Sequence, residues 1–187
     1  MSRSAARPFT VFLDRDGVLN VAPRGLFATR RSWVWLPGAK DAVARLNRKG
    51  MRICLATNQP FVGVGLLPAR RLENLHAWML DELREAGGRI DRIEYASRAF
   101  GRRHKPRPGM LEDGGKALGA DPKRAVMVGD NLKDAEAATR YGCKAILLAT
   151  THSKEVLEGE VKQRGWDVPV VASLADAVSL ILAMSGL

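Results

Sequence analysis

Cysteine is scarce in this chain of 187 residues: only Cys54 and Cys143 occur, each inside an apolar stretch. No Cys-x-x-Cys pair and no Cys/His ligand spacing is present, so we predict two buried core thiols and no structural zinc. The three histidines, His76, His104 and His152, show no metal-ligand spacing either. Aromatic residues make up only 6% and do not alternate with arginines as in single-strand nucleic-acid platforms, so a nucleic-acid partner is not favoured.

Long apolar runs are also missing. The first run, residues 9–13, is interrupted by Asp14 and is too short for a signal-peptide core or a bilayer span. We therefore expect a soluble cytoplasmic protein with no membrane partner. A hydrophobic content of 46% and a charged content of 27% predict one compact domain over residues 1–187 rather than disorder. The sequence does not indicate the oligomeric state.

Positive charge is in excess. The 30 Lys and Arg residues against 20 Asp and Glu residues give a net charge of +10 and a pI of about 10.2. Such a balance attracts anions: phosphorylated metabolites, nucleic acid or an acidic surface. The basic residues concentrate at 24–31 and 98–107. These stretches could line a binding site or be ordinary solvated surface, and the sequence leaves both interpretations open.

Six short apolar runs alternate with amphipathic segments. We predict strands over 9–13, 51–57, 93–97, 125–129, 145–150 and 168–173, and helices over 39–49, 69–86, 110–118, 133–141, 154–164 and 174–184. Ser173 and Asp176 indicate a capping box for the last helix. Strand alternating with helix predicts an α/β fold with a Rossmann-like doubly wound parallel sheet. Ligands of such sheets bind beyond the carboxyl ends of the strands.

Carboxylates follow two of these strands. Asp14 and Asp16 leave the first strand, with Gly17 allowing a sharp turn, and Asp130 leaves the fourth. Like charges in a poorly solvated place repel one another, and a divalent cation with oxygen ligands relieves that repulsion. An ordinary acidic loop is the alternative explanation for the first pair. Asp134, four residues after Asp130, could equally be a helix-start acid favoured by the helix dipole.

Two further segments offer groups for an anion. The second strand ends in TNQ at 57–59, whose hydroxyl and amides can hold phosphoryl oxygens or satisfy a loop. The segment HKPRPG at 104–109 contains two prolines that set a rigid extended path, so Lys105 is held as a fixed positive charge suited to phosphoryl oxygens. A basic loop before a proline-started helix is the alternative.

In chain order, DRDGVLN at 14–20, the Thr of TNQ, the Lys of HKPRPG and GDNLKD at 129–134 resemble the four motifs of the haloacid dehalogenase (HAD) superfamily. With WLPGA at 35–39 and KPRPGM at 105–110, the chain is most similar to the branch of histidinol-phosphate and D-glycero-D-manno-heptose 1,7-bisphosphate phosphatases. The resemblance implies an HAD-like fold and a Mg²⁺-dependent phosphatase, with a heptose 1,7-bisphosphate as the expected substrate. In this sequence the connections at 17–39 and 97–105 are too short to contain a separate cap domain, so we expect an open site.

The resemblance also assigns roles to individual residues. Asp14 is implied as the nucleophile and Asp16 as the general acid/base. The implied Mg²⁺ ligands are Asp14, the backbone carbonyl of Asp16 and Asp130. The implied substrate-binding residues are Thr57, Asn58, His104 and Lys105. Asp134 is implied as a supporting residue.

The chain departs from that branch at three places. The Cys/His zinc loop usual before the lysine motif is absent from 96–103, His104 replaces a common arginine, and Pro60-Phe61 replace Ser-Gly. Because these positions are expected to contact the substrate, histidinol phosphate and a DNA 3′-phosphate remain alternative substrates. A phosphate- or nucleic-acid-binding module without turnover is the non-enzymatic alternative, and the intact set of Asp14, Asp16, Lys105 and Asp130 argues against it.

Overall fold

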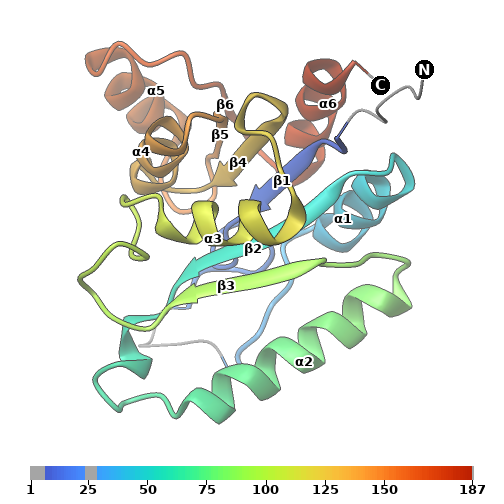
Figure 1. Ribbon diagram of the computed structural model, residues 1–187, viewed down its shortest axis with the longest axis vertical. Coiled ribbons are helices and arrows are strands. Elements are labelled where there is room, and N and C mark those ends of the chain that lie inside the picture. The colour runs from blue at the N-terminus through green and yellow to red at the C-terminus, as the bar shows by residue number, and fades with distance from the viewer. Residues whose placement is uncertain (1–6, 24–28, 187) are drawn as a thin grey trace.

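The computed structural model describes residues 7–23 and 29–186 and has the predicted α/β architecture (Figure 1). The strands are β1 (Thr10–Leu13), β2 (Arg52–Asn58), β3 (Arg92–Ala96), β4 (Ala125–Gly129), β5 (Lys144–Leu148) and β6 (Val170–Val171). The helices are α1 (Ala39–Arg48), α2 (Ala69–Glu85), α3 (Gly109–Leu118), α4 (Leu132–Tyr141), α5 (Lys154–Gln163) and α6 (Leu174–Ser185). Two short 3₁₀ helices, Pro60–Val62 and Pro122–Arg124, were not predicted.

The six strands form one sheet in the order β3-β2-β1-β4-β5-β6, and every adjacent pair is parallel. In this sheet Val11 of β1 lies opposite Ile53 of β2 on one side and Val126 of β4 on the other. The chain therefore winds outward from β1 in one direction and then, from β4 onward, in the other. Ligands bind doubly wound sheets at such a reversal point, beyond the carboxyl ends of the strands.

Helices cover both faces of the sheet and create two cores. One core packs α1, α2 and α6 against side chains such as Val11 and Leu13, and the other packs α3, α4 and α5 against side chains such as Phe12. Successive strand residues point to opposite faces, so a central strand covered on both sides must be apolar throughout. All four residues of β1 are buried accordingly.

Helix ends agree only partly with prediction. The Oγ of Ser173 accepts a hydrogen bond from the Asp176 N–H at 3.2 Å, as a cap should. The Asp176 carboxylate, however, accepts from the Ser173 hydroxyl at 2.7 Å, so the reciprocal half of the predicted capping box is not made there. A complete capping box occurs instead at the start of α4, between Asn131 and Asp134.

The two cysteines differ in burial. Cys54, in β2, is buried, and burial raises the pKa of its thiol. Cys143, in the connection between α4 and β5, is only half-buried, so the prediction of two buried core thiols is wrong for this residue. Burial nevertheless raises the pKa of Cys143 to about 12. Neither thiol is therefore a reactive thiolate near neutral pH.

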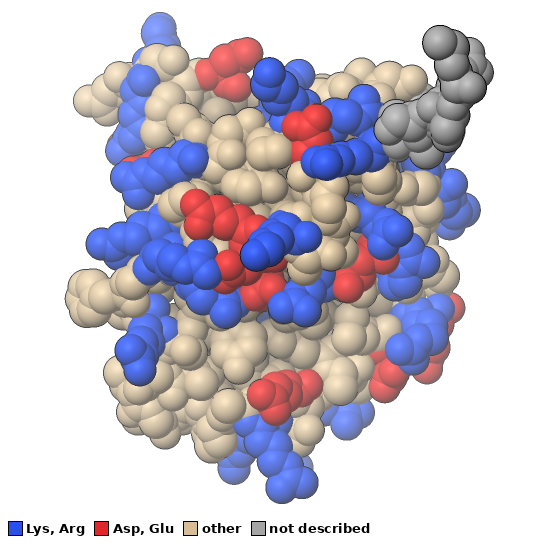
Figure 2. All heavy atoms as spheres, in the orientation of Figure 1, with Lys and Arg blue, Asp and Glu red and all other residues tan. Residues whose placement is uncertain are grey.

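The excess positive charge is spread over the visible face of the molecule. Figure 2 shows Lys and Arg side chains over much of this face, with Asp and Glu side chains interspersed among them. Of the basic stretch at 24–31, residues 24–28, including Arg24, lie outside the described residues. Within the described part of the chain, no helix combines the length and the apolar character needed to cross a membrane.

Candidate active site at the carboxyl edge of the sheet

A cleft of about 230 Å³ opens at the carboxyl ends of β1, β2 and β4, at the reversal point of the sheet. Most of the predicted site residues line it, namely Asp14, Asp16, Thr57, Asn58, Lys105, Asp130 and Asp134. Ala22, Asn131 and Lys133 complete its described lining and were not singled out from the sequence. His104 does not line this cleft but a neighbouring loop cavity of about 270 Å³.

Lys105 sits at the centre of the cleft, with 1% of its surface exposed. Its Nζ lies 2.8 Å from Asp14 Oδ2 and 2.6 Å from Asp134 Oδ1, and it donates a hydrogen bond of 2.8 Å to the Ala56 carbonyl. Burial favours the neutral amine, but the carboxylates of Asp134 and Asp14 outweigh it and hold the pKa of Lys105 above its usual value. The cleft therefore contains a fixed cation.

Asn58 fixes the main chain of Lys105. Its Oδ1 accepts from the Lys105 N–H at 3.0 Å, and its Nδ2 donates to the Lys105 carbonyl at 3.2 Å. The same Nδ2 lies 3.3 Å from His104 Nε2, which accepts. Because both ends of the amide are engaged, the structure gives Asn58 a positioning role for Lys105. The substrate contacts expected of Asn58 and His104 stay predictions.

Three carboxylates, those of Asp14, Asp130 and Asp134, form a cluster whose oxygen atoms lie within 4.8 Å of one another. Burial raises the pKa of Asp14 to about 6, against the opposing effect of Lys105. Burial and the neighbouring carboxylates raise the pKa of Asp130 to about 7, although Thr151 donates a hydrogen bond of 2.6 Å to it. One amine does not balance three carboxylates, so the cluster favours a cation.

The cluster contains two of the predicted metal ligands, the carboxylates of Asp14 and Asp130, and adds a third carboxylate. Asp134, expected only to support the site, contributes a carboxylate, and the Asp16 carboxylate is not part of the cluster. The other oxygen of Asp134, Oδ2, accepts from the Asn131 N–H at 3.1 Å as part of the α4 capping box. Hard oxygen ligands of this kind suit Mg²⁺, so the donor set fits that ion. The backbone carbonyl of Asp16 as a ligand stays a prediction.

Two glycines allow the carboxylates to approach the main chain. Gly17 has φ +80°, and a Cβ on it would lie 2.2 Å from Asp130 Oδ2. A Cβ on Gly129 would lie 2.2 Å from the Asp134 carboxylate. The turn expected at Gly17 is present, and the structure adds a steric reason why only glycine fits.

The Asp16 carboxylate is held by three side chains. Arg15 Nη2 donates to it at 2.8 Å, Asn20 Nδ2 at 2.9 Å and Gln59 Nε2 at 3.1 Å. Gln59 Nε2 also donates to Thr57 Oγ1 at 3.1 Å. Since the Thr57 oxygen accepts from Gln59, its own proton is available to an anion in the cleft. Gln59 thus orients two site residues, a role that TNQ alone did not reveal.

Arg15 was also missed in the sequence, although a cation at the end of an apolar strand was the available signal. It is fully buried, lies over the Trp33 ring at 6.0 Å, and donates to His76 Nε2 at 3.2 Å. Burial and the Arg15 charge lower the pKa of His76 to about 3, so His76 is neutral and accepts that bond. This histidine helps to hold Arg15 against Asp16.

The arginines at 98–107 do not line the cleft, which answers for this stretch the question that the sequence left open. Arg102 pairs with Glu112 at 3.1 Å and Asp113 at 2.5 Å, both on α3. Arg103 pairs with the buried Glu94 on β3 and lies 3.7 Å from Asp113. Among the residues of this stretch, only Lys105 lines the cleft. The paired arginines anchor the loop because acidic side chains of β3 and α3 face it.

Comparison with known proteins identifies the family. Residues 4–142 match the family described as haloacid dehalogenase-like hydrolase. The chain belongs to that family. Its candidate site residues lie in the cleft at the carboxyl edge of the α/β sheet, and Asp14 directly follows β1.

Relatives of this HAD-like hydrolase are named as heptose-1,7-bisphosphate 7-phosphatases. A protein of Rhodopseudomonas palustris named D-glycero-beta-D-manno-heptose-1,7-bisphosphate 7-phosphatase is 37% identical over 152 residues, which cover 76% of this chain and 84% of the relative. A Mycobacterium tuberculosis protein named as the corresponding alpha-heptose phosphatase is 31% identical over 172 residues, covering 89% and 90%.

A solved structure agrees with the fold of this HAD-like hydrolase. The D,D-heptose 1,7-bisphosphate phosphatase of B. bronchiseptica, solved with magnesium and phosphate, superposes with a TM-score of 0.83. It is 31% identical, and the match covers 93% of this chain and 98% of that one. At this coverage the likeness extends over nearly the whole chain.

Proposed function

We propose that this HAD-like hydrolase is a Mg²⁺-dependent phosphatase that removes the 7-phosphate of D-glycero-D-manno-heptose 1,7-bisphosphate through an aspartyl-phosphate on Asp14. The observation that carries the proposal is the placement of Asp14 at the end of β1. One of its oxygens, Oδ2, lies 2.8 Å from the Lys105 ammonium, and the carboxylates of Asp130 and Asp134 lie beside it. A nucleophilic carboxylate next to a fixed cation and a metal-binding cluster suits phosphoryl transfer.

The cleft residues orient and neutralise a phosphoryl group. Asp14 Oδ1 accepts from the Arg15 N–H at 2.7 Å, which holds the carboxylate in one orientation. Lys105 and Thr57 line the cleft, where the ammonium charge and the Thr57 hydroxyl would bind phosphoryl oxygens. Mg²⁺, held by Asp14, Asp130 and Asp134, would add positive charge against the same oxygens when bound.

The chemistry then proceeds in two displacements. The Asp14 carboxylate forms a bond to phosphorus, the bond from phosphorus to the sugar oxygen breaks, and Asp16 gives its proton to that oxygen. In the second step a water oxygen forms the new bond to phosphorus while Asp16 takes the water proton. The bond to Asp14 breaks and free phosphate leaves. Arg15, Asn20 and Gln59 keep Asp16 beside the cleft for both proton transfers.

The substrate is carried over from relatives named for both anomers of the heptose bisphosphate. The open cleft and the lysine and carboxylate groups in it support a phosphorylated sugar but do not distinguish the anomers. The test measures phosphate release from both anomers, with histidinol phosphate, fructose 1,6-bisphosphate and a 3′-phosphorylated oligonucleotide as competing substrates. Each reaction is run with and without Mg²⁺, beside the Asp14→Asn variant.

Mg²⁺-dependent release that is greatest for one heptose anomer, and at least about 10³-fold lower in Asp14→Asn, is the expected result. Circular dichroism of the variant checks that its fold is retained. Near-full turnover by the folded Asp14→Asn variant would refute the nucleophile assignment. Preferred release from histidinol phosphate or the oligonucleotide would keep the chemistry and replace the substrate.

A further inference from the structure

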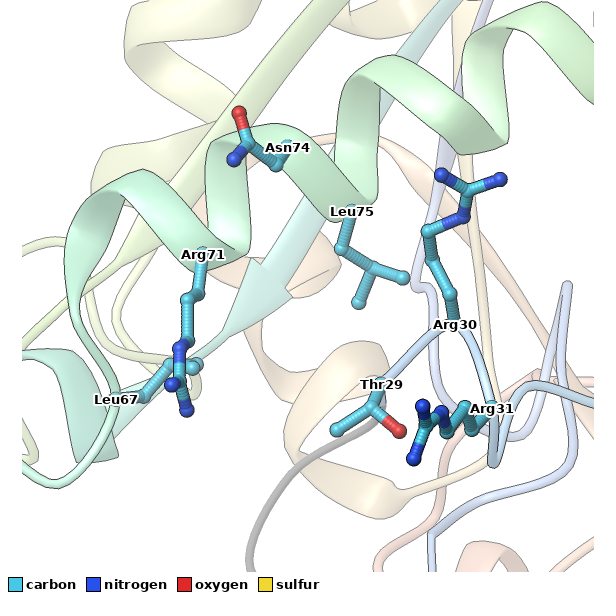
Figure 3. A pocket seen from close by; sticks show the side chains of 7 residues that line it. All are labelled: Thr29, Arg30, Arg31, Leu67, Arg71, Asn74 and Leu75. Carbon is cyan, nitrogen blue, oxygen red and sulfur yellow. The ribbon is translucent and has the colours of Figure 1, made fainter.

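A second and larger pocket, of about 480 Å³, lies between residues 29–31 of the β1–α1 connection and the first turns of α2 (Figure 3). None of its described lining residues is shared with the catalytic cleft. Leu67 and Leu75 are almost fully buried and supply its apolar part. The volume is within the range of small-molecule sites.

The polar part of this pocket is strongly cationic. Arg30, Arg31 and Arg71 line it, and no acidic side chain is among its described lining residues. In the described part of the chain, none of these three arginines forms an ion pair with a carboxylate, in contrast to Arg102 and Arg103. Figure 3 shows Arg71 extending from α2 on one side of the pocket and Arg31 on the segment at the other side, while Arg30 extends toward a later turn of α2. Unneutralised guanidinium groups around a hollow favour an anionic occupant.

We propose that this pocket is a second binding site, separate from the catalytic cleft, for the phosphate group of a phosphorylated small molecule. Planar guanidinium groups match phosphate oxygens bidentately, which makes arginine well suited to this ligand. Leu67 and Leu75, which also line the pocket, accept the less polar part of the ligand.

Ring contacts connect the pocket to the catalytic machinery. Arg30 lies 5.3 Å from the Trp78 ring, Trp78 packs edge-on against Trp33 at 5.7 Å, and Arg15 lies over Trp33 at 6.0 Å. Arg15 in turn holds Asp16 at 2.8 Å. An anion that moves Arg30 therefore changes the surroundings of Trp78, so tryptophan fluorescence reports occupancy of the pocket.

Two sources could supply the phosphate. It could be the distal phosphate of a bisphosphate substrate whose other phosphate occupies the cleft, an alternative that rests on the proposed function. It could also belong to a separate phosphorylated molecule, which does not depend on that function. The shared chemistry is a phosphate bound by guanidinium groups of this pocket, and the two sources are separated by kinetics.

The binding arm titrates the full-length protein with inorganic phosphate and, separately, pyrophosphate in EDTA at constant ionic strength. Tryptophan fluorescence and calorimetry are the readouts. We expect saturable binding that is at least about tenfold weaker in the double variant Arg31→Ser/Arg71→Ser, because charge-assisted hydrogen bonds are lost. Arg70→Ser is the matched control: it removes an exposed arginine of α2 that does not line the pocket, and it should bind as the parent does.

The kinetic arm compares heptose 1,7-bisphosphate with p-nitrophenyl phosphate, which has no second phosphate. A KM raised at least about tenfold for the bisphosphate alone in the double variant assigns the pocket to the distal phosphate of the substrate. Unchanged KM values with weakened binding assign it to a separate ligand. Equal binding by parent, double variant and Arg70→Ser, with unchanged kinetics, overturns the proposal. If no substrate is turned over but the binding difference persists, the pocket stands and the proposed function fails.

Discussion

Asp130 provides a test of whether the carboxylate cluster destabilises the metal-free protein while it favours cation binding. It is 8% exposed, and its carboxylate belongs to a group of three whose oxygens lie within 4.8 Å of one another. The substitution Asp130→Asn removes one negative charge while keeping an oxygen that can accept from Thr151, which donates to Asp130 at 2.6 Å. We expect the metal-free protein to become more stable and the effect of Mg²⁺ on stability to disappear.

The expected magnitude follows from the geometry. Two carboxylates 4.8 Å apart repel by about 3.5 kcal/mol at an effective dielectric constant of about 20. Asp130 has two such neighbours, and the Lys105 ammonium offsets roughly one of them. A pKa of about 7 in place of 3.8 corresponds to about 4 kcal/mol in favour of the protonated carboxyl. We therefore expect Asp130→Asn to raise the free energy of unfolding by about 2–4 kcal/mol at pH 8 in EDTA.

The assay is urea denaturation of both proteins in EDTA and in Mg²⁺, at several pH values. The pKa of Asp130 is higher in the folded than in the unfolded protein, so its contribution weakens the fold as pH rises from about 4 to above 7. The parent should lose stability over that window in EDTA, and the variant should lose less. Mg²⁺ should restore the parent only. Asp167→Asn, at an exposed position, is the matched control. If Asp130→Asn is clearly less stable than the parent in EDTA, the repulsion argument is wrong.

Three further substitutions test single contacts. Gly17→Ala places a Cβ 2.2 Å from Asp130 Oδ2 at φ +80°. We expect the free energy of unfolding to fall by about 1–3 kcal/mol in urea denaturation, and kcat for phosphate release to fall at least about 10²-fold. Parent-like activity would contradict the close approach. Gln59→Leu frees Asp16 and Thr57, so kcat should fall about tenfold with the pH profile displaced, while Gln59→Glu tests whether an amide donor is required. Arg103→Ser leaves the buried Glu94 with Arg92 alone and should destabilise by about 1–3 kcal/mol, with Arg103→Lys recovering part of it in thermal melts.

The sequence by itself determined the elements and the edge at which they meet. Apolar runs of strand length alternate with amphipathic segments, and this pattern permits little but a parallel sheet covered on both faces. Each predicted strand and helix is present within two residues of its expected ends. Since the carboxyl ends of parallel strands share one edge, residues that directly follow β1, β2 and β4 had to converge. Asp14 and Asp130, which follow β1 and β4, and Thr57, the penultimate residue of β2, are placed by that rule.

Tertiary structure alone decided which side chains meet once the chain leaves a strand. The direction of a side chain in a turn depends on contacts distant in sequence, and no local pattern encodes them. For this reason Asp134 joins the carboxylate cluster while the Asp16 carboxylate turns to Arg15 and Gln59. Contacts distant in sequence also decide which basic side chains are paired with acids. Arg102 is neutralised by acids that α3 brings to it, whereas Arg31 and Arg71 line one pocket whose described lining contains no acid.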